Sequence, residues 1–261
     1  MSDGDPWSRL RRHTTARIAL GRAGGSLPTE ELLDFQLAHA RARDAVHHPI
    51  DFEGLAQQIT ERTGRETLRL ESAAADRATY LRRPDLGRRL SVPSRAALSG
   101  FDTAPAPEIA VVIGDGLSGL AVERNALPLL TALLPPLDAR GWQLAPITLV
   151  RNARVAIQDE IGALLRARLS VILIGERPGL GVPDSLAAYF TWAPRPGRND
   201  SERNCISNIR DAGLSPGAAA ERLIGLLDAA FARQLSGVAL KDESPLEALG
   251  AQGGAALGRE T

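Results

Sequence analysis

The sequence predicts an α/β fold built on a parallel sheet, with helices on both faces of the sheet and a mostly helical region before it. Three short apolar runs carry this prediction, and helical stretches separate them. The runs are residues 108–116 (EIAVVIGDG), 144–152 (LAPITLVRN) and 170–179 (SVILIGERPG). Continuous apolar strands that alternate with helices are typical of parallel sheets that are buried on both faces.

The first 100 residues are charged and follow a helical pattern. Thr29 is expected to cap a first helix, because a hydroxyl can accept a free backbone N–H and two glutamates follow in the first turn. Apolar residues then recur at helical spacing on one face, at Leu33, Leu37 and Ala40. A second helix is expected to begin at Asp51 and to end at Gly64, with Leu55 and Ile59 on its apolar face.

Composition divides the rest of the chain. The Pro/Ala-rich residues 101–107 are interpreted as a linker between a helical region, residues 1–100, and a sheet domain, residues 108–240. Residues 241–261 are rich in glycine, alanine and glutamate and are expected to form a disordered tail.

Two helices are predicted between the strands. Residues 117–141 form the first, which is expected to bend or split at Pro128, and residues 155–169 form the second. In open α/β sheets, ligands bind beyond the carboxyl ends of the strands. Residues 114–116, 151–155 and 175–177 are therefore expected to lie together in space.

The segment GDGLSG, residues 114–119, matches a dinucleotide-binding pattern after a strand and before a helix. NAD binding also needs an acidic residue at the end of the second strand, where this chain has Arg151 and Arg154. An arginine suits the 2′-phosphate of NADP, so an NADP-binding protein stays an alternative. In the packing interpretation, Gly116 and Gly119 only let the strand turn tightly into a helix.

Composition excludes several classes of protein. Lys plus Arg equals Asp plus Glu at 31 each, which gives no net field for nucleic acid or an anionic membrane. No apolar run approaches the length of a membrane helix. The single cysteine, Cys205, permits no internal disulfide and fits a reducing compartment.

The sequence predicts no catalytic residue and no metal ligand in this chain. All four histidines lie in the first 48 residues, and the adjacent His47 and His48 are interpreted as a solvated helix end. Cys205 lies in a polar loop (RNCISN), residues 203–208. It is interpreted either as a small buried residue or as a contact point in a ligand cleft.

Five segments of the chain resemble the small subunit of ethanolamine ammonia-lyase. They are residues 17–47, 76–91 (DRATYLRRPDLGRRLS), 111–118 (VVIGDGLS), 173–192 (LIGERPGLGVPDSLAAYFTW) and 202–214 (ERNCISNIRDAGL). They occur in the family's order, and the likeness extends from about Arg17 to Ser236.

The resemblance implies a Rossmann-like domain that covers adenosylcobalamin, held between this chain and a barrel-shaped large subunit. The complex is expected to contain several copies of each subunit and to convert ethanolamine to acetaldehyde and ammonia by a radical mechanism. Because no histidine follows His48, the cofactor is expected to keep its own benzimidazole on cobalt. The resemblance implies a cytoplasmic location, with packaging in a bacterial microcompartment as a further option.

Three cofactor contacts are carried over from the family: the backbone of Val155, the carboxylate of Glu176, and Cys205. Without the resemblance, Glu176 is also open to interpretation as an ion-pair partner of Arg177 or Arg203. A non-catalytic scaffold that holds the large subunits together is the remaining alternative, with the helical first 100 residues as its interface.

Overall fold

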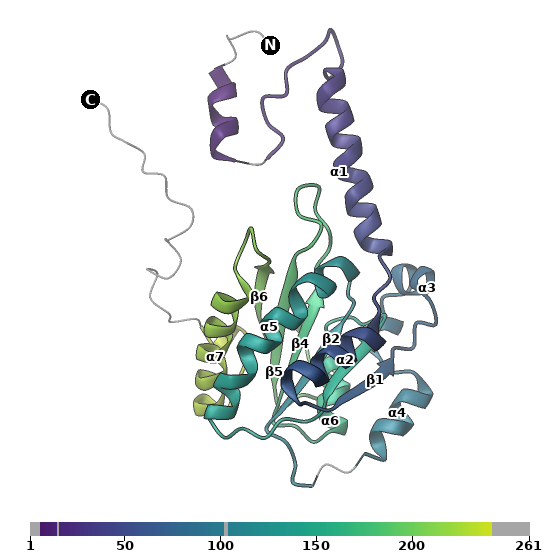
Figure 1. The fold of residues 1–261 in the computed structure, drawn as a ribbon, viewed down its shortest axis with the longest axis vertical. Helices are drawn as coiled ribbons and strands as arrows, with labels where there is room; N and C mark the ends of the chain where they lie inside the picture. Colours follow the sequence, from purple (N-terminus) through teal and green to yellow (C-terminus); the bar gives the residue numbers. More distant parts are fainter. Residues whose placement is uncertain (1–5, 15, 102–103, 242–261) are drawn as a thin grey trace, which may run out of the picture.

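Six strands form one mixed sheet in the computed structural model, which describes residues 6–14, 16–101 and 104–241 (Figure 1). The strand order is β1-β3-β2-β4-β5-β6. The strands are β1 (Thr67–Glu71), β2 (Ile109–Gly114), β3 (Ile147–Arg151), β4 (Leu169–Gly175), β5 (Leu186–Trp192) and β6 (Arg203–Ile209). The predicted disordered tail falls, apart from its first residue, outside the described residues.

The sheet differs from the predicted one at both edges. The three predicted strands, β2, β3 and β4, are parallel, as predicted. β1 is also parallel, but β5 runs antiparallel to β4 and β6 antiparallel to β5. The prediction of a polar loop at residues 203–208 is therefore wrong, because these residues pair with β5 and form most of β6. β1 was not predicted, since its sequence TLRLE lacks a continuous apolar run, yet it pairs with β3. The division into domains at residues 101–107 stays a prediction.

Helices cover both faces of the sheet, as predicted. They are α1 (Thr29–His47), α2 (Phe52–Thr63), α3 (Arg77–Arg82), α4 (Val92–Ser99), α5 (Gly119–Ala139), α6 (Ile157–Leu164) and α7 (Pro216–Arg233), with short 3₁₀ helices at Pro6–His13, Leu86–Arg88, Asp200–Glu202 and Gly237–Ala239. One buried core joins α2, α5 and α7 to one face of the sheet. A second core joins α4 and α6 to the other face.

α5 runs through Pro128 without a break, so the predicted split is wrong. An interior proline removes one helical hydrogen bond and costs roughly 3 kcal/mol. The helix offsets this cost by burying leucines on both sides of the proline, among them Leu127, Leu129 and Leu130.

Of the two N-terminal helices, α2 begins and ends as predicted, whereas the predicted cap of α1 is wrong. α2 is capped by the Asp51 side chain, which accepts the Gly54 N–H, and ends at Gly64 in the left-handed conformation, as predicted. Thr29 is not the cap of α1: Pro28 takes that position, with an extended backbone, and Thr29 is the first helical residue.

The N-terminal arm, which we define as residues 6–14 and 16–47, projects from the body of the molecule (Figure 1). Of the 19 residues of α1, only Ala38 and Ala45 are buried. Leu33 and Leu37, on the apolar face predicted for this helix, are 58% and 49% exposed. The described part of this chain therefore does not cover the apolar face of α1.

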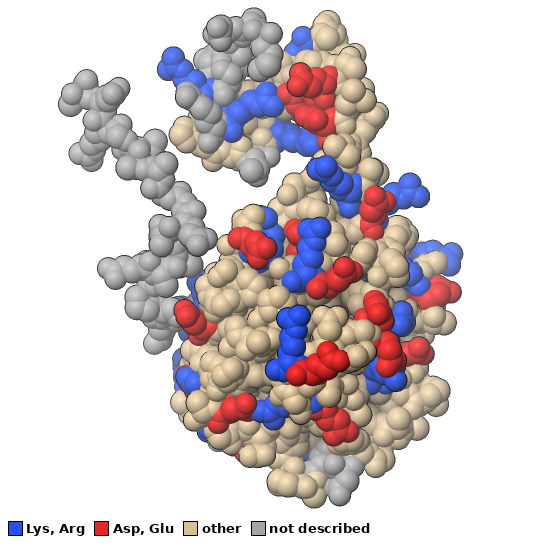
Figure 2. Space-filling view, viewed as in Figure 1, with Lys and Arg blue, Asp and Glu red and all other residues tan. Residues whose placement is uncertain are grey.

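Charges of both signs are mixed over the surface in view (Figure 2). No broad field of one sign appears on that face, in agreement with the balanced composition. Among the described residues, no helix has the length and apolar character that crossing a membrane requires.

Candidate functional site

The carboxylate of Asp115 joins the ends of two neighbouring strands. It follows β2 and accepts the backbone N–H groups of Asn152 and Ala153, which follow β3, each at 2.9 Å. Arg77 at the start of α3 lies 3.5 Å from the same carboxylate and donates to the Gly116 carbonyl at 2.8 Å. Burial raises the pKa of Asp115, while Arg77 and the two backbone N–H groups oppose this rise.

The end of β4 packs directly against the turn after β2. Leu117 donates its N–H to the Gly175 carbonyl at 2.9 Å. Gly116 has a φ of +57°, and a Cβ on it would collide with that same carbonyl. The predicted meeting of the three strand ends is therefore confirmed.

The glycines of GDGLSG pack against protein backbone. A Cβ on Gly119 would collide with the His48 carbonyl, just as one on Gly116 would collide with Gly175. This packing accounts for both glycines without a dinucleotide, as the packing interpretation expects. The NADP alternative therefore has no structural observation in its favour.

Hydrogen bonds from distant segments hold the loop between β3 and α6. Tyr80 donates its hydroxyl to the Ala153 carbonyl at 3.1 Å, and Arg154 donates its N–H to the Gly87 carbonyl at 2.8 Å. Val155 follows, half-buried, at the margin of the second core. Its carbonyl accepts the Gln158 N–H, and its own N–H makes no hydrogen bond within the described residues. Of the backbone groups expected to serve at Val155, the N–H is therefore available.

Glu176 is held by hydrogen bonds and not by an arginine. One carboxylate oxygen, Oε2, accepts the Ser185 hydroxyl and the Asn208 backbone N–H, the latter at 3.0 Å. The other oxygen, Oε1, has no partner among the described residues. The alternative of an ion pair with Arg177 or Arg203 is therefore wrong.

Arg203 is engaged elsewhere in the molecule. It forms a buried ion pair with Asp159 of α6 and a second ion pair with Asp200 at 2.7 Å. These contacts join the start of β6 to α6 and leave Glu176 without an arginine partner.

Cys205 lies on β6 with an exposed side chain, so its interpretation as a small buried residue is wrong. It pairs across the sheet with Tyr189 of β5. Desolvation by neighbouring atoms raises the pKa of the Cys205 thiol, although part of the side chain reaches the surface, and the Glu176 carboxylate adds to this rise. The thiol is therefore a neutral, polar contact and a weak nucleophile near pH 7.

Among the described residues, α6 reaches one side of β5 and β6 only at the end with Thr191 and Arg203, where Asp159 pairs with Arg203. α7 covers the side with Phe190 and Ile206, which belong to the first core. On the opposite side, β6 contributes nothing to the second core, and of β5 only Tyr189 packs at its margin. We call this side, with Tyr189 and Cys205, the open face.

The predicted site residues border this open face. Val155 and Tyr189 pack at the margin of the same core, Cys205 pairs with Tyr189, and Glu176 binds the backbone of Asn208 in β6. Tyr189 was missed by sequence reasoning. The only local signal is the alternation in LAAYFTW, which places Tyr189 and Phe190 on opposite sides of a strand.

The described residues contain no group of three or more His, Cys, Asp or Glu side chains that could hold a metal ion. The imidazole of His48 contacts Glu123 of α5 and connects the end of the arm to the body. Around Tyr189 and Cys205, the open face carries neutral polar groups beside the carboxylate of Glu176, and the charged group of Arg203 and Asp159 lies at its far end.

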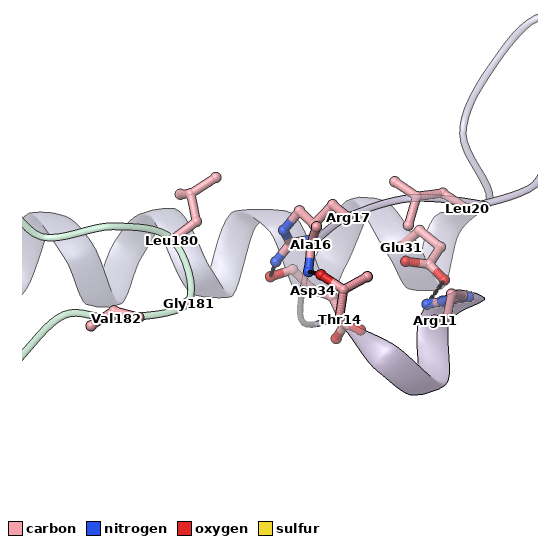
Figure 3. Close-up of a pocket in the computed structure, with 10 residues that line it drawn as sticks. All are labelled: Arg11, Thr14, Ala16, Arg17, Leu20, Glu31, Asp34, Leu180, Gly181 and Val182. Atoms are coloured by element: carbon pink, nitrogen blue, oxygen red, sulfur yellow. Dashed lines mark hydrogen bonds and ion pairs between the residues drawn. The ribbon is translucent and has the colours of Figure 1, made fainter. Parts of the chain in front are cut away.

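A cavity of about 700 Å³ lies between the N-terminal arm and the turn at residues 180–182 (Figure 3). Arg11 pairs with Glu31 at 2.8 Å, and Arg17 donates to the Asp34 carbonyl at 3.0 Å; both contacts stay within the arm. None of the predicted cofactor contacts lines this cavity.

A family model described as "Ethanolamine ammonia-lyase light chain (EutC)" matches residues 4–241. Three curated relatives carry the name ethanolamine ammonia-lyase small subunit. The protein of Pseudomonas fluorescens Pf-5 is 57% identical over 247 residues, covering 94% of this chain and 90% of the relative. That of Pseudomonas aeruginosa LESB58 is 57% identical over 249 residues with the same coverage. That of Pseudomonas syringae pv. tomato is 56% identical over 247 residues, covering 94% of this chain and 86% of the relative.

Asp115→Asn is expected to lower the free energy of unfolding by about 2–3 kcal/mol, because the amide cannot accept both backbone N–H groups and no longer offsets Arg77. Urea unfolding checks this value. Asp228→Asn is the matched control, since Asp228 forms an exposed ion pair with Arg140 and should change stability by less than about 1 kcal/mol. If both substitutions lower the free energy of unfolding by the same small amount, the role given to Asp115 is contradicted.

Proposed function

Because the chain belongs to the ethanolamine ammonia-lyase light-chain family, we propose that it covers adenosylcobalamin, with the cofactor held between this small subunit and the large subunit of the enzyme. The enzyme would convert ethanolamine to acetaldehyde and ammonia. The observation that carries the proposal is the open face of β5 and β6, which Val155, Glu176 and Cys205 border.

The chemistry of the open face fits a corrin ring. The rim of a corrin bears amide side chains, and each primary amide offers two N–H donors and one carbonyl acceptor. Glu176 has a free carboxylate oxygen, Val155 has a free N–H, and the exposed Cys205 carries a neutral thiol. Scattered single donors and acceptors suit such a rim better than a cluster of like charges would.

When bound, adenosylcobalamin supplies the radical that starts the reaction. The residues of this chain have supporting roles. Glu176 accepts amide N–H groups, Val155 donates its N–H to an amide carbonyl, and the sheet beneath them excludes water from one side of the cofactor. The Ser185 and Asn208 bonds to Glu176 hold its carboxylate before the cofactor binds.

The reacting substrate is assigned to the large subunit. In this chain Cys205 is the sole cysteine, and all four histidines lie in the arm or directly after it. His48 contacts Glu123 of α5, which packs in the first core, on the side of the sheet opposite the open face. The chain thus offers neither a Cys-His pair nor an imidazole for cobalt at that face. We propose that the cofactor keeps its own benzimidazole as the axial base and that the small subunit alone has no lyase activity.

The N-terminal arm is proposed as a contact surface for the large subunit. Large apolar side chains are exposed along it: Leu10, Leu27, Leu32, Leu33, Phe35 and Leu37, with Leu180 of the nearby turn. Among the described residues only Val92 and Val238 are exposed large apolar side chains elsewhere. Exposed apolar surface of this extent marks a protein contact. A pure scaffold would need the arm but not the open polar face, so we favour the cofactor-covering role.

Leu33→Asp combined with Leu37→Asp is expected to weaken the complex with the large subunit at least about tenfold, because apolar anchors carry most of the energy of an interface. Co-purification and a binding titration of the two subunits measure the loss. Val92→Asp is the control, since Val92 is 82% exposed and lies outside the arm. If the double variant melts at the temperature of the wild type and still forms the complex fully, the arm is not part of the interface.

Glu176→Gln is expected to weaken binding of adenosylcobalamin to the two-subunit complex several-fold, about 1 kcal/mol, because a charge-assisted hydrogen bond is replaced by a neutral one. Titration of the reconstituted complex measures this change. Glu221→Gln on the exposed side of α7 serves as the control. If Glu176→Gln keeps the affinity of the wild type but melts at a lower temperature, Glu176 has a structural role and the site lies elsewhere.

A further inference from the structure

Tyr189 lies in the middle of the open face. In the sheet it pairs with Ile172 of β4 on one side and with Cys205 of β6 on the other. Its side chain is half-buried and packs at the margin of the second core together with Val155. Of the predicted contacts, Cys205 is therefore a direct neighbour of Tyr189 in the sheet, and Val155 packs against the same core.

The ends of the open face differ in their surroundings. Towards the start of β6, Thr191 and Arg203 are buried, and the pair between Arg203 and Asp159 closes that end. Towards the other end, Cys205, Ser207 and Asn208 are exposed. An aromatic ring at the boundary between these parts offers a flat, partly apolar surface beside polar groups.

Tyr189 and Cys205 are paired across β5 and β6. Burial is the main cause that raises the pKa of the Tyr189 phenol, and Cys205 and Glu176 raise it further. Burial also raises the pKa of the Cys205 thiol, an effect that Tyr189 partly opposes. Both groups are therefore neutral near pH 7 and offer polar contacts without charge.

We propose that Tyr189 is a binding residue for the macrocyclic cofactor. Its ring would supply an aromatic surface to the macrocycle, and its neutral hydroxyl would bond a polar group of the rim beside Cys205. This inference rests on the proposed function, and it adds a residue that binds through its aromatic surface to three positions that bind through polar groups.

The ligand class follows from the composition of the open face. Among the described residues, Glu176 is the carboxylate near Tyr189 that no arginine pairs, since Asp159 and Asp200 are paired with Arg203. An aromatic surface with single donors and acceptors around it suits a large planar ring with neutral polar substituents. A phosphate-rich ligand would instead require cationic side chains at the centre, where this chain has Tyr189 and Cys205.

Two substitutions in the reconstituted two-subunit complex test the inference. Tyr189→Leu removes the aromatic surface and is expected to weaken binding of hydroxocobalamin about tenfold. Tyr189→Phe keeps the ring and loses the hydroxyl, so binding is expected to weaken about two- to fivefold. Trp142→Leu is the control, because Trp142 stacks on Phe231 on the α7 side of the sheet and should leave the affinity unchanged.

Affinity is read from the visible absorbance of the corrinoid, and melting of each complex without corrinoid is measured in parallel. A structural role alone would lower the melting temperature and leave the affinity of the folded fraction unchanged, which would overturn the inference. If both Tyr189 variants bind hydroxocobalamin as tightly as the wild type, while Glu176→Gln binds it more weakly, the inference is overturned and the proposed function stands. If the wild-type complex itself binds no corrinoid, the proposed function fails.

Discussion

The buried carboxylate of Asp115 is the constraint on which the arrangement of the site depends. A carboxylate in the interior is stable only when its oxygens are bonded, and here two backbone N–H groups beyond β3 and the guanidinium of Arg77 bond them. These bonds place the loop that carries Val155. The tight turn after Asp115 then brings Gly116 against Gly175, immediately before Glu176. One side chain thereby sets the relative positions of three strand ends that are far apart in the sequence.

The remaining side of the site depends on the antiparallel edge of the sheet. β5 and β6 extend the sheet beyond most of the second core, and one of their sides is exposed from Cys205 to Asn208. Tyr189 and Cys205 line that side, and Glu176 reaches it through the backbone of Asn208. The site is thus assembled from a rigid group of strand ends and an uncovered strand pair. Both are fixed by backbone hydrogen bonds, so little ordering is needed when a large ligand binds.

The sequence allowed us to predict those elements that neighbouring residues in the chain specify. β2 to β4 are continuous apolar runs buried on both faces, and the turn glycines follow β2 directly, so periodicity and spacing sufficed for them. β1 and β6 were missed because polar residues interrupt their apolar pattern, and only pairing with a distant strand identifies them. β5 was also missed, although its sequence LAAYFTW is largely apolar. Tyr189 was missed because its neighbour Cys205 lies across the sheet and no local pattern encodes that pairing. Pro28 displaced Thr29 as the cap of α1 because its own backbone already has the extended conformation that precedes a helix.

The most direct test of the central idea, that a corrinoid lies on the open face, uses Cys205 as a reporter. The rate of its alkylation in the two-subunit complex is measured by mass spectrometry of this chain, with and without saturating hydroxocobalamin. Cys205→Ser combined with Val238→Cys moves the thiol to a position that is 78% exposed, in a segment that binds Asn204 on the α7 side of the sheet. The account predicts that corrinoid slows alkylation of Cys205 strongly and leaves the relocated thiol unaffected. Equal rates at Cys205 with and without bound corrinoid would contradict it.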